Sequence, residues 1–195
     1  MEFNRKLVTT APLCERYKGY LLKMFITFFI IAFMISISVI RTYAAEPNIA
    51  QSKASYNYSY EELHFMAQVV YNEANAESED GKKAVASVIL NRFFTNNVEF
   101  SNKNYSSIIS VIEEPNQFAV YPKRSDNLLE KTGCYDAVKA AIDGDDPTVC
   151  SDIPGGALFF NAEWKLGNWG VKKLFVNSKG VSVMLIDHQG YYDTY

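Results

Sequence analysis

Apolar residues recur at helical spacing in two neighbouring segments of the chain, residues 60–76 and 82–94. Ser59, followed by Glu62 three residues later, has the pattern of a capping box and marks the start of the first segment. Residues 78–81 are mostly polar and end in glycine, which predicts a turn between the segments. The pattern therefore predicts two helices, whose buried faces carry Leu63, Met66, Val69 and Val70 in the first and Val85, Val88 and Ile89 in the second.

Shorter helices are predicted further along the chain. An apolar run predicts a third helix over residues 106–113, which Pro115 ends. Residues 126–143 predict another helix, interrupted near Gly133. The intervening segments, residues 96–104 and 116–124, are expected to be loops.

The C-terminal part of the chain has the pattern of strands. Residues 157–160 predict a short buried strand, and residues 172–176 and 181–186 predict a hairpin that turns through residues 177–180. Helices come first and a small sheet follows. This order indicates one α+β domain, mainly helical with a small antiparallel sheet.

An uncharged and strongly apolar run spans residues 24–40 and follows a cationic N-terminus. Such a run directs export, either as a signal peptide cleaved near Ala45 or as an uncleaved membrane anchor. We therefore assign residues 1–45 to a signal peptide or membrane anchor, residues 46–59 to a linker and residues 60–195 to the folded domain. Either alternative predicts an exported, extracytoplasmic domain.

The charge balance argues against nucleic acid as a partner. The chain has 19 Lys and Arg against 22 Asp and Glu, a net charge of −3. Cleavage after residue 45 would remove six basic and two acidic residues and leave a net charge of −7. Nucleic-acid binding depends on basic residues that neutralise phosphates. With two histidines in the whole chain, no metal site is expected, and no cofactor is predicted.

Two cysteines, Cys134 and Cys150, follow the predicted export segment. Outside the cell they either form a disulfide that closes a short loop or remain two thiols. Their spacing leaves both alternatives open. A thiol hydrolase that pairs Cys134 with His188 is disfavoured, because no supporting motif surrounds the cysteine.

Two carboxylates stand one helical turn apart where the first predicted helix ends, at Glu73 and Glu77. A carboxyl group held against an apolar core can keep its proton near neutral pH and act as a general acid. This arrangement suggests cleavage of a sugar bond. Helical spacing by itself favours an exposed glutamate at a helix end for Glu73.

Three blocks of sequence resemble one family of enzymes. They read Tyr71-x-Glu73-Ala74 with Glu77, Gly81, Ala84-Val85-Ala86, Val88-Ile89 and Asn91-Arg92, then Pro115-Asn116-Gln117-Phe118, and then Gly156-Ala157-Leu158-Phe159-Phe160-Asn161. Over residues 60–192 the chain resembles the catalytic domain of the SleB/CwlJ-type cell-wall hydrolases, the spore cortex-lytic family. The resemblance implies a lysozyme-like, lytic-transglycosylase-like fold, in which a helix presents the catalytic Glu to a groove beside a small sheet.

The resemblance also implies a substrate, the glycan strands of peptidoglycan in the cell wall or spore cortex, and it places Glu73 as the general acid. Glycosidases that use water need a second carboxylate, and nothing in the sequence nominates Asp126, Asp152 or Asp187. A single Glu suits a lytic transglycosylase, in which the C6 hydroxyl of the substrate attacks C1. Hydrolysis by a muramidase or glucosaminidase is the alternative chemistry. A non-catalytic, membrane-anchored wall-binding module is the alternative function.

The candidates for substrate binding are Glu77, Gln117, Phe118, Tyr121, Asn161 and His188. The amides among them can bond sugar hydroxyls or N-acetyl groups, and the two aromatic rings can stack on sugar faces. For Gln117, Phe118 and Tyr121, packing within their loop is an equal alternative to substrate binding. For Glu77, a structural role is likewise an equal alternative. Arg92 is expected to be a structural ion-pair residue at a helix end. The protein is expected to be a monomer.

Overall fold

The structure is a computed structural model that describes residues 53–163 and 167–194. The predicted signal peptide or membrane anchor, residues 1–45, lies outside the described residues. Within the described ranges, no helix is both long enough and apolar enough to cross a membrane.

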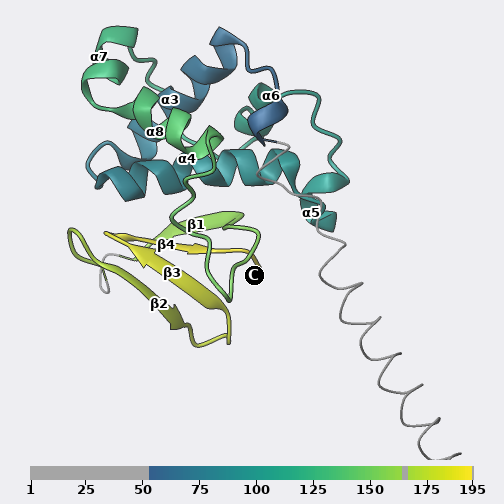
Figure 1. Cartoon of the computed structure of the whole chain (residues 1–195), viewed down its shortest axis with the longest axis vertical. Coiled ribbons are helices and arrows are strands. Elements are labelled where there is room, and N and C mark those ends of the chain that lie inside the picture. The colour runs from purple at the N-terminus through teal and green to yellow at the C-terminus, as the bar shows by residue number, and fades with distance from the viewer. Residues whose placement is uncertain (1–52, 164–166, 195) are drawn as a thin grey trace, which may run out of the picture. The chain divides into compact units, whose positions relative to one another are not determined.

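The two predicted long helices form the centre of the domain (Figure 1). α3 spans Tyr60–Ala74 and begins with the predicted capping box, in which the side chains of Ser59 and Glu62 each accept from the other's backbone N–H. α4 spans Glu79–Phe94 and has Ser78 as its N-cap. α3 ends two residues earlier than predicted and α4 begins three residues earlier, because Ser78 caps α4 directly, so the turn lies at residues 75–78.

Three of the shorter helices match the predicted segments. They are α6 (Ile108–Ile112), α7 (Asp126–Lys131) and α8 (Cys134–Ile142). Gly133 separates α7 from α8 with φ 71°, a left-handed conformation that glycine adopts readily, so the predicted interruption is confirmed. α8 packs against both α3 and α4. Fully buried side chains from these elements form the main core, including Met66, Val70, Ile89, Ile112, Val138 and Ala141.

A fourth short helix, α5 (Val98–Ser101), lies in a segment predicted to be a loop. The side chain of Asn97 accepts from the backbone N–H of Glu99 at 2.9 Å and caps this helix. Phe100 is buried in a second, smaller hydrophobic cluster with Phe159 and Tyr192. This tertiary contact stabilises a helical turn too short to be recognised from spacing.

The sheet is antiparallel and has the strand order β1-β4-β3-β2. Its strands are β1 (Phe159–Ala162), β2 (Lys172–Val176), β3 (Ser182–Ile186) and β4 (Gln189–Tyr192). The predicted α+β class and the β2–β3 hairpin are confirmed. β4 was not predicted, because it follows β3 through a tight turn at Asp187 and His188 that lacks glycine. Figure 1 shows the sheet beneath α4, with β1 as the strand nearest to that helix.

Residues 53–58, which the sequence analysis placed in a linker, pack against the domain. Lys53 is buried, and its ammonium group donates to Asn91 Oδ1 at 2.6 Å. The ring of Tyr56 lies edge-on to those of Phe93 and Phe94, and its hydroxyl donates to Glu62 at 2.7 Å. These isolated aromatic residues anchor the segment without producing a periodic pattern in the sequence.

Cys134 and Cys150 are free thiols in the structure. Cys134 is buried at the start of α8, and this burial raises the pKa of its thiol. A raised pKa disfavours the thiolate that a cysteine nucleophile needs.

Candidate active site

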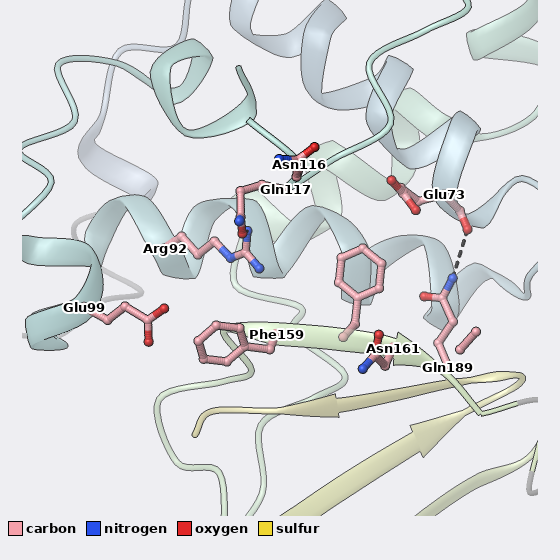
Figure 2. Close-up of a pocket in the computed structure, with 10 residues that line it drawn as sticks. Glu73, Arg92, Glu99, Asn116, Gln117, Phe159, Asn161 and Gln189 are labelled. Carbon is pink, nitrogen blue, oxygen red and sulfur yellow. Dashed lines mark hydrogen bonds between the residues drawn. The ribbon is translucent and has the colours of Figure 1, made fainter. Parts of the chain in front are cut away.

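A pocket of about 480 Å³ lies where α3 and α4 meet the sheet edge (Figure 2). Its walls come from the end of α3, the end of α4, α5, the loop after α6, and the strands β1 and β4. The lining residues are Glu73, Arg92, Glu99, Asn116, Gln117, Phe159, Phe160, Asn161, Ala162 and Gln189. The pocket thus brings together Glu73, Gln117 and Asn161, three of the residues nominated from the sequence.

Glu73 is half-buried in the last turn of α3 and is held at two points. Its carboxylate Oε1 accepts from the backbone N–H of Ala119 at 2.6 Å. Its backbone carbonyl accepts from Gln189 Nε2 at 2.9 Å, the bond that Figure 2 marks with a dashed line. One contact fixes a carboxylate oxygen, and the other fixes the end of the helix against β4.

Gln189 is itself aligned from within the core. The hydroxyl of Tyr191 lies 2.6 Å from Gln189 Oε1 and donates to it, with the carbonyl of Gly81 a further acceptor at 3.2 Å. Tyr191 is fully buried, and this burial raises its pKa well above the ordinary value. Its hydroxyl therefore remains a hydrogen-bond donor across the physiological range. The chain of contacts from Tyr191 through Gln189 to Glu73 sets the position of the last turn of α3.

Arg92 lies on the pocket and also organises its wall, a larger role than the helix-end ion pair expected for it. The side chain is 5% exposed, and its Nε donates to the carbonyl of Leu158 at 2.6 Å. Its terminal nitrogen donates to Gln117 Oε1 at 2.9 Å and so orients that amide. The guanidinium carbon lies 4.8 Å from the ring centre of Phe118, and 5.2 Å and 5.5 Å from those of Phe100 and Phe159. These contacts are in the range of cation–π interactions.

The two aromatic residues nominated for stacking occupy different places. Phe118 packs between Arg92 and Phe160, with the two phenyl ring centres 6.3 Å apart, so it supports the wall from behind. Tyr121 is 70% exposed and lies in the loop outside the pocket. The aromatic residues that line the pocket are Phe159 and Phe160 from β1.

Glu77 and His188 contact each other outside the lining of the pocket, where they join two turns of the chain. Glu77 is 8% exposed, and its Oε2 lies 3.3 Å from both the backbone N–H and Nδ1 of His188. Next to them the fully buried Asp187 accepts from the backbone of Ser78 at 2.8 Å and from that of Gly170 at 2.7 Å. These contacts bind the turn between α3 and α4 to the turn between β3 and β4. Glu77 and His188 therefore help to fix the position of α3 relative to the sheet.

A second carboxylate reaches the pocket at Glu99 in α5. Figure 2 shows Glu73 and Glu99 at opposite ends of the pocket, with Arg92 and Asn161 between them. The aspartates considered from the sequence are engaged elsewhere: Asp126 with Tyr60 and Tyr135, Asp152 with Ser182, and Asp187 in the turn described above.

Sequence reasoning missed several lining residues for identifiable reasons. Gln189 belongs to the unpredicted strand β4, and Glu99 to the unpredicted helix α5. Asn116, Phe159 and Phe160 lay inside the blocks that carried the family resemblance, which was the available signal for them.

The model of the cell wall hydrolase family matches residues 76–186, more than half of the chain. The chain belongs to the cell wall hydrolase family. This confirms the resemblance drawn from the three sequence blocks. The matched segment includes Arg92, Gln117 and Asn161 and begins just after Glu73. The place of Glu73 in this hydrolase domain therefore rests on the geometry of the pocket.

Among similar proteins is the spore cortex-lytic enzyme of Oceanobacillus iheyensis, 34% identical over 113 residues, which are 57% of this chain and 37% of that protein. The spore cortex-lytic enzyme of Bacillus subtilis is 35% identical over 112 residues, 57% of this chain and 33% of that protein. The chain thus spans less than two-fifths of the length of these relatives. A similar solved structure is the catalytic domain of the Bacillus cereus SleB protein, with 25% identity and a TM-score of 0.47, over 72% of this chain and 96% of that one.

Proposed function

We propose that this chain cleaves the glycan strands of peptidoglycan, in the cell wall or spore cortex, as a lytic transglycosylase with Glu73 as its acid and base. The observation that carries the proposal is the position of Glu73 at the pocket, fixed through Ala119 and Gln189. The names of the spore cortex-lytic relatives support the choice of substrate. The membership in the cell wall hydrolase family supports the reaction class.

Glu73 begins the reaction as an acid. Its Oε1 accepts from Ala119, which leaves Oε2 as the oxygen that delivers the proton to the bridging glycosidic oxygen. The bond between C1 and that oxygen breaks through an oxocarbenium-like state, and the leaving sugar departs as an alcohol. The C6 hydroxyl of the remaining sugar then attacks C1 and returns a proton to Glu73. The product is a 1,6-anhydro sugar, and no water is consumed.

The polar wall of the pocket supplies contacts for the sugar. The amides of Asn116, Gln117 and Asn161 offer donors and acceptors to hydroxyl and N-acetyl groups. Arg92 holds Gln117 in place through its 2.9 Å hydrogen bond, so this contact is preorganised. Phe159 and Phe160 add apolar surface on the side of β1.

The product decides the chemistry. The full-length protein is incubated with purified peptidoglycan and with spore cortex in water enriched in ¹⁸O, and the released fragments are analysed by mass spectrometry. We expect anhydro-muramyl ends without ¹⁸O. Reducing ends that carry ¹⁸O would instead establish hydrolysis, and the sugar at the new end would separate a muramidase from a glucosaminidase.

The alternative of a non-catalytic wall-binding module is tested in the same samples. A binding module would sediment with insoluble peptidoglycan and release no fragments. An enzyme would release fragments in proportion to its concentration, and a Glu73→Gln control would sediment with the wall without releasing them.

The variant Glu99→Gln distinguishes transglycosylation from hydrolysis by its effect on the rate. For a transglycosylase we expect kcat/KM to fall less than about tenfold, because Glu99 lies at the opposite end of the pocket from Glu73. A second carboxylate that activates water would cost roughly 10²–10⁴-fold on removal. The rate of fragment release from peptidoglycan measures the effect. A loss in the larger range would overturn the single-carboxylate mechanism.

Gln189→Leu should reduce kcat about tenfold while KM changes little. The substitution removes the hydrogen bond to the carbonyl of Glu73 and lets the last turn of α3 shift, and small displacements of a catalytic group are costly. Tyr191→Phe, which removes the hydroxyl that aligns Gln189, should act in the same direction with a smaller effect. A raised KM with unchanged kcat for Gln189→Leu would make Gln189 a substrate contact instead of a positioning residue.

We also infer export of the domain, a contact with the membrane if residues 1–45 remain attached, and a monomeric state. N-terminal sequencing of the extracytoplasmic protein distinguishes the alternatives, since a new terminus near Glu46 indicates a cleaved signal peptide. An intact N-terminus in the membrane fraction indicates an anchor. Light scattering of the purified protein tests the monomeric state.

A further inference from the structure

A second cavity of about 530 Å³ is lined by residues of all four strands and of the turn between β2 and β3. Asn161 of β1 lines both cavities. Beside it, the ring of Phe159, which lines the first, stacks on the ring of Tyr192, which lines the second, with centres 5.6 Å apart and planes at 17°. The two cavities are therefore neighbours, joined at Asn161 and at this pair of rings.

The chemistry of the second cavity differs from that of the first. It is more apolar than the first: Phe175, Val181, Val183 and Tyr192 line it, beside the polar residues Asn177, Ser178 and Thr194. Two side chains of opposite charge, Glu163 and Lys179, also line it. Sugars of the glycan strand are rich in hydroxyl groups, whereas the peptides attached to its muramic acid carry small apolar side chains, carboxylates and an amino group. Apolar side chains together with one carboxylate and one ammonium group complement such a peptide.

Both charged residues are held in fixed places by the local backbone. The N–H of Glu163 donates to the carbonyl of His188 at 2.7 Å, and its own carbonyl accepts from Gly167 at 2.9 Å. Its side chain lies across Gly190 of β4, where an added Cβ would come within 2.9 Å of Glu163 Cγ. A glycine in the middle of β4 thus leaves the space that this side chain occupies.

Lys179 stands on the turn between β2 and β3. The side chain of Asn177 accepts from the backbone N–H of Lys179 at 2.9 Å and from that of Val181 at 3.0 Å. The turn is therefore ordered by its own hydrogen bonds, and it presents Lys179 to the cavity.

The geometry points to this second cavity as a binding site for the stem peptide of peptidoglycan. The inference deepens the proposed function and rests on it for the placement of the glycan strand. A muramyl unit beside Glu73 would direct its peptide over Asn161 and onto the sheet. There Lys179 would bind a peptide carboxylate and Glu163 the amino group. The cavity then selects strands that carry peptides, without taking part in bond cleavage.

The test compares two charge-neutral double variants of the full-length protein. Glu163→Gln/Lys179→Ala changes the cavity, and Glu130→Gln/Lys131→Ala makes the same change on exposed residues of α7. Each is assayed on peptidoglycan strands with their peptides and on strands from which an amidase has removed them. On peptide-bearing strands we expect the cavity variant to lose about tenfold in kcat/KM, mainly through KM, a change of roughly 1.4 kcal/mol. On stripped strands it should match the wild type, and the α7 variant should match the wild type on both.

Other outcomes overturn the inference in distinguishable ways. If the cavity variant loses kcat/KM equally on both substrates, the cavity binds sugar and not peptide. If it loses kcat/KM on neither, the cavity takes no part in substrate recognition. Titration of the wild type with the free tripeptide of alanine, glutamate and diaminopimelate, followed by NMR, tests the cavity separately. If the wild type cuts neither substrate, the proposed function fails, and peptide binding that the cavity variant abolishes would still support the site. Absence of tripeptide binding together with equal activity on both substrates would overturn it.

Discussion

Glu73→Gln is expected to lower the rate of strand cleavage by about 10³-fold. The amide has nearly the shape of the carboxyl group, and its oxygen can still accept from the N–H of Ala119. It cannot donate an acidic proton to the glycosidic oxygen or take one back from the C6 hydroxyl. The loss should therefore fall on kcat, because the change removes an interaction that matters in the transition state.

Two controls make this prediction specific. Glu61→Gln alters an exposed glutamate in the first turn of the same helix and should leave the activity within about twofold of the wild type. Thermal unfolding of Glu73→Gln should match that of the wild type, and its binding to insoluble peptidoglycan should be retained. A Glu73→Gln variant that keeps more than a tenth of the wild-type rate would exclude Glu73 as the general acid.

The long helices were predictable because their signals are local. The capping box at Ser59 and the apolar stripe that follows it belong to one contiguous segment, and both helices are present with ends that differ from the prediction by two or three residues. Gly133 likewise marked the interruption between α7 and α8. Such features depend on few neighbours in space, so the sequence alone contains enough information.

The wall of the pocket depended on contacts that are distant in the sequence. β4 is short and buried on both faces, and its identity as a strand follows from pairing with β1 and β3. Without β4, Gln189 could not be placed beside Glu73. Phe118 was predicted to stack on sugars because it is aromatic. Its ring instead packs against the buried guanidinium of Arg92 and forms part of the wall. The aromatic side chain of Phe118 therefore did not reveal its role, because that role depends on its contact with Arg92, which is distant in the sequence.

Gly156 lies just before β1, where one residue affects both the stability of the fold and the position of the site. Gly156 has φ 78°, and a Cβ added there would lie 2.4 Å from Asn91 Nδ2 and 2.4 Å from Asp146 Oδ2. Asn91 is fully buried, and its amide donates to Asp146 at 3.0 Å and to the carbonyl of Ala157 at 2.9 Å. Lys53 completes the network through Asn91 Oδ1. No side chain larger than hydrogen fits at Gly156 without displacing these buried groups.

We expect Gly156→Ala to reduce the free energy of unfolding by about 4 kcal/mol, from left-handed strain of roughly 1–2 kcal/mol and disrupted buried hydrogen bonds of roughly 1–3 kcal/mol. For a chain of this size the melting temperature should fall by about 10 °C. Gly133→Ala is the matched control, because Gly133 has φ 71° but no neighbour within 4 Å of an added Cβ. It should show the strain alone. Calorimetry of both variants measures the difference, and an equal loss in the two would mean that the network around Asn91 yields freely to the new methyl group.

If the network is as rigid as its burial implies, Gly156→Ala will also shift the start of β1, and with it Asn161, so cleavage should weaken even below the melting temperature.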